Sequence, residues 1–380
     1  MNLEFKNQLS HTLKNSNIYM YWKGRVALYA LLKAMGVGDG DEVIIPAYTC
    51  VVVPNAILYL GAKPVYVDIN HETYNSDPIN FKGAITNKTK VIILQNTYGL
   101  SSNLEEIIYL AKQNNLFTIE DCTHGFGGEY NGHPNGTYCD SAFYSTQWNK
   151  PFSTGIGGFA LVNNLKLIEQ LEVVNLDLLT PSLRETASLR IQLIARKYLL
   201  NNATYWIALK LYRFLSANSV ILGSSSGEEI NTTRLPKNYF KSMSKTQSNA
   251  GIKALRQLEK TISRRKENGH KYTVFLKQNK KQYVAPALHT NHSFLKYPLL
   301  VTNRKKFLVL AEKNNIMLGD WFTSPIHPVK QNLQEWMFEP KNYPVATKIA
   351  SKVVNLPTDI NPKELKRVLN FLSDHLIEIE

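Results

Sequence analysis

The feature that most restricts the fold is an alternation of short apolar runs with helical patterns through the first 170 residues. The apolar runs are residues 43–46, 63–68, 91–95 and 116–120, and the helical patterns are residues 24–34, 51–60 and 103–115. Short continuous apolar runs separated by helices are typical of a parallel sheet that is covered on both faces. The alternation therefore predicts one α/β domain in this part of the chain.

The second half has a different pattern. Residues 188–215 form two basic amphipathic helical patterns that Asn201 and Asn202 interrupt, and residues 224–227 are typical of a loop. A long helix is predicted over residues 247–277. Strand and helix patterns then alternate over residues 292–301, 305–314, 345–354 and 363–376. We therefore expect a large α/β domain over residues 1–180, an inserted segment over 181–240, and a linking helix with a smaller α+β domain over 241–380.

Charge is distributed unevenly along the chain. The net charge is +14, yet residues 1–180 carry 12 Lys and Arg against 16 Asp and Glu, while residues 181–380 carry 32 against 14. This excess indicates either an anionic partner or a solvated basic face. Because no recognition motif accompanies the charge, we do not expect nucleic acid as a partner.

Cysteine content and hydropathy restrict the cellular compartment in which we expect the protein. The three cysteines cannot all pair, which favours a reducing, cytoplasmic setting. No apolar run approaches the roughly 20 residues that a membrane span needs. The polar residues 1–16 lack the apolar core of a signal peptide.

The residues with the clearest chemical meaning lie between positions 117 and 158. Asp121 ends a predicted strand, where open α/β sheets place ligands, and His124 follows three residues later. Lys150 precedes a Thr-Gly-x-Gly-Gly turn that ends at Gly158. This set suits pyridoxal phosphate, because a lysine forms a Schiff base with its aldehyde and a carboxylate keeps its ring nitrogen protonated. An imidazole can lie against the ring, and a helix start with small hydroxyl residues can hold the phosphate.

Each of these residues also has a simpler interpretation when taken alone. Asp121 could cap a helix, and His124 could be a hydrogen-bonded core histidine. Lys150 could be one more solvated lysine, and residues 155–158 could form only a tight turn. The prediction depends on the joint spacing rather than on any single member.

Several motifs in order along the chain resemble the DegT/DnrJ/EryC1/StrS family of sugar aminotransferases. They are Gly24-Arg-Val-Ala-Leu28, Gly38-Asp-Gly-Asp-Glu-Val-Ile-Ile-Pro-Ala-Tyr-Thr49, Gly61-Ala-Lys-Pro-Val-Tyr-Val-Asp68, Tyr98-Gly99, and the Pro344-Val-Ala to Leu356-Pro357 ending. The resemblance implies the α/β fold of type I pyridoxal-phosphate-dependent transferases. It also implies a large domain with a mostly parallel seven-stranded sheet, a smaller C-terminal α+β domain, and a homodimer with shared active sites.

The resemblance also assigns roles to individual residues. Lys150 matches the Schiff-base lysine, and Asp121 matches the carboxylate on the pyridine nitrogen. His124 matches the residue that stacks on the ring. Ser145 matches a phosphate-binding serine, and Gly24 and Arg25 match the phosphate site at the start of the first helix of the domain. Some relatives that act as dehydratases have histidine in place of the lysine, so Lys150 favours transamination.

Two departures from the family pattern concern residues that are expected to contact the substrate. Cys50 stands where the family often has an aromatic residue, which makes Tyr48 the candidate for stacking. The family has an Asn-Tyr-Arg-Met segment that reaches the partner subunit's active site. Residues 238–245 of this chain, which begin at Asn238, match that segment only in part. Its arginine is missing, and Lys241 or Lys245 would supply the charge. We expect Tyr98, Asn238 and Lys241 to contact substrate or the partner subunit.

The resulting functional prediction is an aminotransferase without a metal. It would move an amino group from an amino acid, glutamate by family resemblance, to a keto sugar that is attached to a nucleotide, for surface polysaccharide or related glycan synthesis. The alternative keeps the fold but binds a membrane surface through residues 181–226, a basic amphipathic composition suited to anionic lipids, at the inner face of the membrane. That protein would act on a lipid-linked or other anionic substrate, or would be a non-catalytic regulatory relative.

Overall fold

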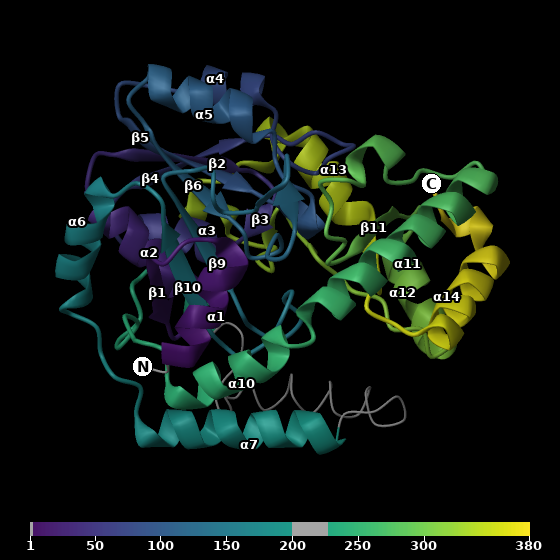
Figure 1. Cartoon of the computed structure of the whole chain (residues 1–380). Helices are drawn as coiled ribbons and strands as arrows, with labels where there is room; N and C mark the ends of the chain where they lie inside the picture. The colour runs from purple at the N-terminus through teal and green to yellow at the C-terminus, as the bar shows by residue number, and fades with distance from the viewer. Residues whose placement is uncertain (1–2, 200–226) are drawn as a thin grey trace.

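The computed structural model describes residues 3–199 and 227–380, and its centre is a seven-stranded sheet (Figure 1). The strand order is β1-β10-β9-β6-β5-β2-β4. The strands are β1 (Ile18–Tyr21), β2 (Glu42–Pro46), β4 (Lys63–Val67), β5 (Thr89–Gln95), β6 (Phe117–Asp121), β9 (Ser141–Ser145) and β10 (Gly158–Val162). Strands β4, β2, β5, β6 and β9 pair in parallel, and β10 runs antiparallel to both β9 and β1. The predicted fold class, a mostly parallel seven-stranded α/β sheet, is confirmed.

Helices cover both faces of this sheet. The helices of this part are α1 (Leu3–Leu13), α2 (Gly24–Ala34), α3 (Val52–Leu58), α4 (Pro78–Ala84), α5 (Leu104–Gln113) and α6 (Lys166–Asn175). On one face α2, α3 and α6 bury a large cluster with the sheet, in which Val43, Val91 and Ile119 take part. On the other face α4 and α5 pack over Ile44, Ile92 and other strand residues. Strands that are apolar on both sides are what a doubly covered parallel sheet requires.

The C-terminal part has its own apolar cluster. Its elements are α11 (Leu258–Gln278), β11 (Tyr297–Leu300), α12 (Arg304–Lys313), α13 (Pro344–Lys352), β13 (Val353–Leu356) and α14 (Pro362–Asp374). β11 and β13 form an antiparallel pair, and α11, α12 and α14 pack around a cluster that includes Tyr272, Phe307 and Phe371 (Figure 1). The described chain also contains short 3₁₀ segments and four two-residue strands, β3 (Thr49–Cys50), β7 (Glu129–Tyr130), β8 (His133–Pro134) and β12 (Ile326–His327).

Two predictions about the middle of the chain need correction. The single helix expected over residues 247–277 is two helices, α10 (Lys245–Leu255) and α11, which separate at Arg256 and Gln257. The break lets α10 pack beside α1 while α11 reaches the C-terminal cluster (Figure 1). The loop expected at residues 224–227 is described only at its last residue, where α9 (Gly227–Asn231) begins.

The first of the two predicted basic helices is present. Helix α7 (Leu183–Leu199) begins five residues before the predicted start. The second pattern, residues 205–215, lies outside the described residues. The division into domains at residues 180 and 240 stays a prediction.

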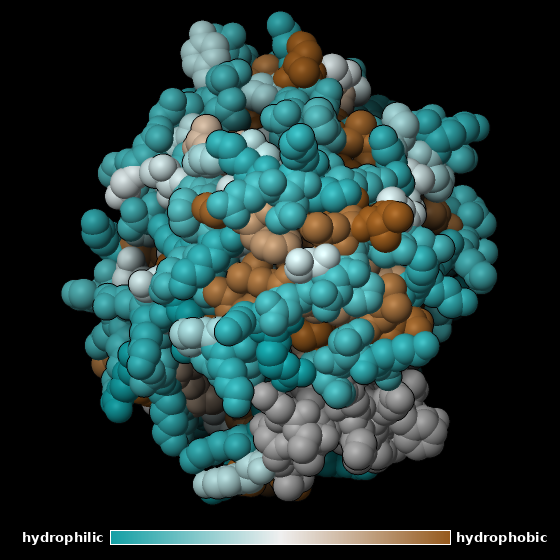
Figure 2. Space-filling model, turned by 90° about the vertical axis from the view of Figure 1, so that its right-hand side faces the viewer, coloured by the Kyte–Doolittle hydropathy of each residue, from teal (hydrophilic) through white to brown (hydrophobic). Residues whose placement is uncertain are grey.

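Figure 2, which views the side formed by the C-terminal part, is mainly hydrophilic with apolar side chains across its middle. Within residues 3–199 and 227–380, no helix combines the length and the hydropathy that crossing a membrane requires.

Candidate active site

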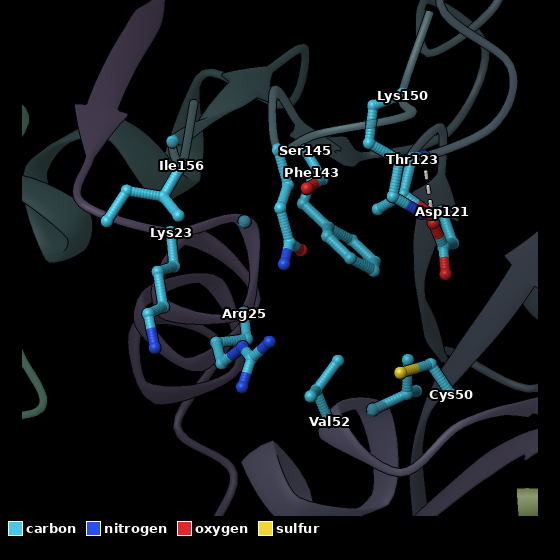
Figure 3. A pocket seen from close by; sticks show the side chains of 14 residues that line it. Lys23, Arg25, Cys50, Val52, Asp121, Thr123, Phe143, Ser145, Lys150 and Ile156 are labelled. Carbon is cyan, nitrogen blue, oxygen red and sulfur yellow. Dashed lines mark hydrogen bonds between the residues drawn. The ribbon is translucent and has the colours of Figure 1, made fainter. Parts of the chain in front are cut away.

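A pocket lies where the carboxyl ends of the parallel strands meet the start of α2. Figure 3 shows Lys150, Asp121 and Thr123 at one side of it and Lys23 and Arg25 at the opposite side. Five of the residues predicted from sequence line this pocket, namely Gly24, Arg25, Asp121, Ser145 and Lys150. Open α/β sheets bind ligands at this edge, because helix starts and strand ends converge there.

Lys150 is carried by a tight loop between the antiparallel strands β9 and β10. The loop is closed by the hydroxyls of Thr146 and Thr154, which are 2.6 Å apart, and by the Thr154 N–H, which donates to the Thr146 carbonyl at 2.8 Å. Gly155 has φ of +88° at the turn, a conformation that favours glycine. Arg265 of α11 donates to the Pro151 carbonyl at 3.1 Å and so fixes the residue next to Lys150.

Burial sets the protonation of Lys150. The side chain is half-buried, and the loss of hydration lowers its pKa to about 8, although the nearby Asp121 carboxylate opposes the change. A lysine with a pKa near the physiological range can exist as a free amine, which is the form that attacks a carbonyl carbon.

Asp121 ends β6 and is 3% exposed. Burial raises the pKa of its carboxyl group, while hydrogen bonding from Thr123 and the charge of Lys150 oppose the rise. One carboxylate oxygen accepts the Thr123 N–H at 2.9 Å (Figure 3). This bond holds the carboxylate at the strand end, where it can face a cationic ring nitrogen.

His124 is buried in a stack of aromatic rings that the sequence did not reveal. Its ring lies parallel to the indole of Trp321, with centroids 5.0 Å apart and an interplanar angle of 4°. The His124 Nδ1 accepts the Tyr98 N–H at 3.2 Å, and burial holds the pKa of the imidazole well below its usual value. His124 is therefore a neutral, flat group whose orientation the Tyr98 backbone sets.

The start of α2 packs directly on strands β9 and β10. A Cβ on Gly24 would lie 2.8 Å from the Tyr144 carbonyl oxygen, and a Cβ on Gly158 would lie 2.2 Å from the Gly24 Cα. Only glycine at both positions lets the helix start approach this closely. The unpaired N–H groups of a helix start bind anions, and Ser145 lies beside them in the pocket.

An unpredicted carboxylate neutralises the cations beside this helix start. Glu229 of α9 is 3% exposed and accepts a hydrogen bond from Arg25 at 2.5 Å, with the Lys23 ammonium at 3.6 Å. Burial lowers the pKa of Lys23, whereas Glu229 and smaller contributions outweigh burial and raise the pKa of Arg25. Sequence patterns could not find Glu229, because it lies 204 residues from Arg25 in the chain.

The comparisons with known proteins agree on one family. The chain matches the DegT/DnrJ/EryC1/StrS aminotransferase family over residues 1–203 and 223–373. The chain belongs to this family. It is 42% identical over 147 residues to the GDP-perosamine synthase of Escherichia coli O157:H7, an alignment that covers 39% of this chain and 40% of that relative. The chain thus spans about two fifths of the length of this curated relative.

Solved structures of the DegT/DnrJ/EryC1/StrS family share the fold. An aminotransferase of this family from Brucella abortus has a TM-score of 0.74 at 18% identity, covering 98% of this chain and 89% of that one. NtdA from Bacillus subtilis with bound cofactor PMP has a TM-score of 0.72 at 22% identity, covering 99% and 77%. The predicted family and fold are confirmed, and the PMP bound to NtdA agrees with the predicted pyridoxal phosphate cofactor.

The donor set of this pocket fits that cofactor. It combines a lysine of lowered pKa, a buried carboxylate, and a helix start that two glycines hold against the sheet. Within the described ranges, no group of three or more His, Cys, Asp or Glu side chains is arranged to hold a metal ion.

The three predicted substrate or partner contacts lie away from the pocket lining. Tyr98 is fully buried, and its hydroxyl donates to the Trp321 carbonyl at 2.7 Å. Asn238 is exposed, and Lys241 pairs with Glu185 of α7 at 2.7 Å. Their predicted contacts with substrate or the partner subunit stay predictions.

The two sequence departures also have structural outcomes. Cys50 lines the pocket, and burial raises the pKa of its thiol, so the sulfur stays protonated. Tyr48, the suggested stacking residue, is instead fully buried and bonds to the Tyr98 hydroxyl at 2.6 Å. Its ring meets the edge of Phe322, with ring centroids 5.1 Å apart, and the residues that follow it pair in parallel with β12.

Proposed function

We propose that the protein transfers an amino group from an amino acid to a keto sugar that is attached to a nucleotide. The observation that carries this proposal is the placement of Lys150 and Asp121 in one pocket with the α2 helix start. In such a pocket a lysine amine, a buried carboxylate and an anion site serve one bound molecule.

The pocket residues divide the binding of the cofactor among them. Bound pyridoxal phosphate supplies a carbonyl carbon that accepts amino groups and a ring that withdraws electrons. The Gly24 helix start and Ser145 hold its phosphate, and Asp121 keeps its ring nitrogen protonated. His124 is buried and is not among the residues that line the pocket, and it would offer the cofactor ring a neutral imidazole, because a charged imidazole would oppose the protonated nitrogen.

Lys150 has two functions in this proposal. Its Nζ would anchor the cofactor covalently, and its released amine would carry a proton between the α-carbon of the donor and the reacting carbon of the cofactor. The loop contacts of Thr146, Thr154 and Arg265 would keep this amine in reach of the donor α-carbon and of the reacting carbon of the cofactor. A pKa of about 8 gives the amine both protonation states near neutral pH.

The substrate class follows from the named relative and the family. The E. coli relative is named for a GDP-linked amino sugar, and glutamate is the donor that family resemblance implies. We propose surface polysaccharide or related glycan synthesis as the pathway. The nucleotide would add an anionic diphosphate to the acceptor, which suits a chain with net charge +14.

Two measurements test this function. Borohydride reduction of the holoprotein followed by peptide mapping should place the pyridoxyl label on Lys150. Keto-sugar nucleotides incubated with glutamate should release 2-oxoglutarate. A label on another lysine would contradict the anchor, and no label would favour the non-catalytic alternative.

A membrane-surface association is the second candidate, and helix α7 is the observation that favours it. Its large apolar residues Leu183, Ile191, Ile194 and Tyr198 are 90%, 67%, 51% and 69% exposed. The same helix carries four Lys and Arg residues, which suits an anionic lipid surface. Co-sedimentation with phosphatidylglycerol vesicles tests it with the Ile191→Asn, Ile194→Asn variant, and equal binding by both proteins would refute the association.

We further propose a cytoplasmic homodimer. The family resemblance implies shared active sites, and the exposed Asn238 is available to a partner subunit. The three cysteines are free, which suits a reducing compartment. Analytical ultracentrifugation tests the dimer, and a monomer at micromolar concentration would contradict it.

A further inference from the structure

A second lysine lies against the same indole as Lys150. The Lys296 Nζ is 5.7 Å from the centroid of the Trp321 ring, and the Lys150 Nζ is 4.6 Å from it. Trp321 in turn stacks on His124. Lys296 therefore belongs to the same aromatic cluster as the proposed anchoring lysine, although it precedes β11 in the C-terminal part of the chain.

The backbone of Lys296 is tied to this cluster. Its N–H donates to the Tyr98 carbonyl at 3.3 Å, and the Tyr98 N–H donates to the His124 Nδ1 at 3.2 Å. These two bonds connect Lys296 to the ring-stacking histidine through a single residue. The Lys296 backbone thus has a defined position relative to His124 and Trp321.

The other cations around the pocket already have protein partners. Arg25 and Lys23 contact Glu229, and Arg265 donates to the Pro151 carbonyl. Within the described part of the chain, no carboxylate lies at ion-pair distance from Lys296. Lys296 is half-buried, and a cation in such a place is stabilised by an anionic ligand.

The charges that face Lys296 come from several elements. Arg265 of α11 and Lys150 disfavour its charged form, whereas Asp320 and Asp359 favour it. Burial is the largest influence, and together these groups lower the pKa of Lys296 to about 8. An incoming carboxylate would restore the charged form.

We propose that Lys296 binds the carboxylate of the amino-acid donor. This inference rests on the proposed function. The donor's carboxylate is attached to the carbon that bears the transferred amine, so its binding group must lie close to Lys150. The diphosphate of a nucleotide sugar is separated from the keto carbon by the sugar ring and would reach a more distant cation. Because both ammonium groups lie over the Trp321 ring, Lys296 lies as close to Lys150 as this binding role requires.

Equilibrium binding to the holoprotein tests the assignment. The probe is glutarate, an unreactive dicarboxylate of the same length as glutamate, and its Kd is measured by calorimetry. Lys296→Met should raise this Kd at least tenfold, and Lys296→Arg should keep it within about threefold of wild type. Lys305→Met, which removes an exposed lysine on α12, is the matched control and should leave the Kd unchanged.

A second arm separates the two kinds of anion. The Kd for guanosine diphosphate should be the same in Lys296→Met and wild type. A loss confined to guanosine diphosphate would overturn the donor assignment, and so would an unchanged Kd for glutarate. Equal thermal unfolding midpoints for Lys296→Met and Lys305→Met would show that the variants are folded.

The outcome for Lys296 is independent of the outcome for the acceptor. If the wild type converts no keto-sugar nucleotide but Lys296→Met still weakens glutarate binding, the proposed function fails and the carboxylate site stands. If transamination proceeds and the KM for glutamate is the same in both proteins, only the inference about Lys296 is overturned.

Discussion

The two ends of the pocket differ in whether their charged side chains form an ion pair. At the Lys150 end, the ammonium and the Asp121 carboxylate influence each other's pKa, but no direct ion pair between these two described residues is present. At the α2 end, Arg25 is held by Glu229 at 2.5 Å in a buried pair (Figure 3 shows Arg25 opposite Lys150). The difference teaches that the lysine proposed to exchange protons is left free to titrate, whereas Arg25 beside the helix start is held in its charged form by Glu229.

Removing Lys150 should have the largest effect. Lys150→Ala should lower the rate of 2-oxoglutarate release at least about 10³-fold, because the proton carrier and the covalent anchor are lost together. Lys166→Ala, on the exposed start of α6, is the matched control and should keep the wild-type rate. More than a tenth of the wild-type rate in Lys150→Ala would disprove its role.

Neutralising Asp121 should have the next largest effect. Asp121→Asn keeps an oxygen that can accept the Thr123 N–H but loses the buried negative charge. We expect kcat to fall about 10²- to 10³-fold, a typical loss for one preorganised electrostatic group. Steady-state kinetics with glutamate check this, and a kcat within threefold of wild type would show that the carboxylate is only structural.

Breaking the Arg25–Glu229 pair should lower the stability of the fold rather than the rate of the reaction. Glu229→Gln leaves the buried Arg25 and the partly exposed Lys23 without a counter-charge, so we expect the free energy of unfolding to fall by about 3 kcal/mol. Urea denaturation measures it. The matched control is Glu185→Gln, whose pair with Lys241 is more exposed and should be worth less than about 1 kcal/mol. An equal loss of unfolding free energy in both variants would show that the Arg25–Glu229 pair is no stronger than the more exposed Lys241–Glu185 pair.

The smallest expected effect is a pH dependence at the Lys150 end. The folded pKa of about 8 lies below the ordinary value of 10.5, so the neutral amine forms as the pH rises through 8. The rate at which the apoprotein attaches pyridoxal phosphate should rise about tenfold from pH 7 to pH 9 and then level off. Stopped-flow absorbance measures it. Because Asp121 raises the Lys150 pKa, Asp121→Asn should move the midpoint below 8; a rate still rising at pH 10 would contradict the shift.

Much of the fold could be predicted from local patterns. The four apolar runs became β2, β4, β5 and β6, because strands buried on both faces must be continuously apolar. The patterns did not reveal β1, β9 and β10. β1 and β10 pair residues that lie more than 130 positions apart, as in Ile18 with Leu161, and no local window contains that information.

The break between α10 and α11 has a similar cause. Helical spacing continues through Arg256 and Gln257, so sequence periodicity predicts one helix. Two separate apolar clusters, one at α1 and one at α14, decide the break, because a single straight helix cannot pack on both.

For the site, the sequence by itself determined the residues that must occur in fixed order. Asp121 and Ser145 end the neighbouring parallel strands β6 and β9, and Lys150 lies in the loop after β9. The parallel register that brings these strand ends together follows from the sheet type. Only the tertiary structure decided the groups that surround them. Glu229, Trp321 and Lys296 come from segments distant in the chain, and their effect depends on burial and on distances of a few ångströms. Electrostatic interactions of that range arise when the chain is folded, and for that reason no spacing rule predicts them.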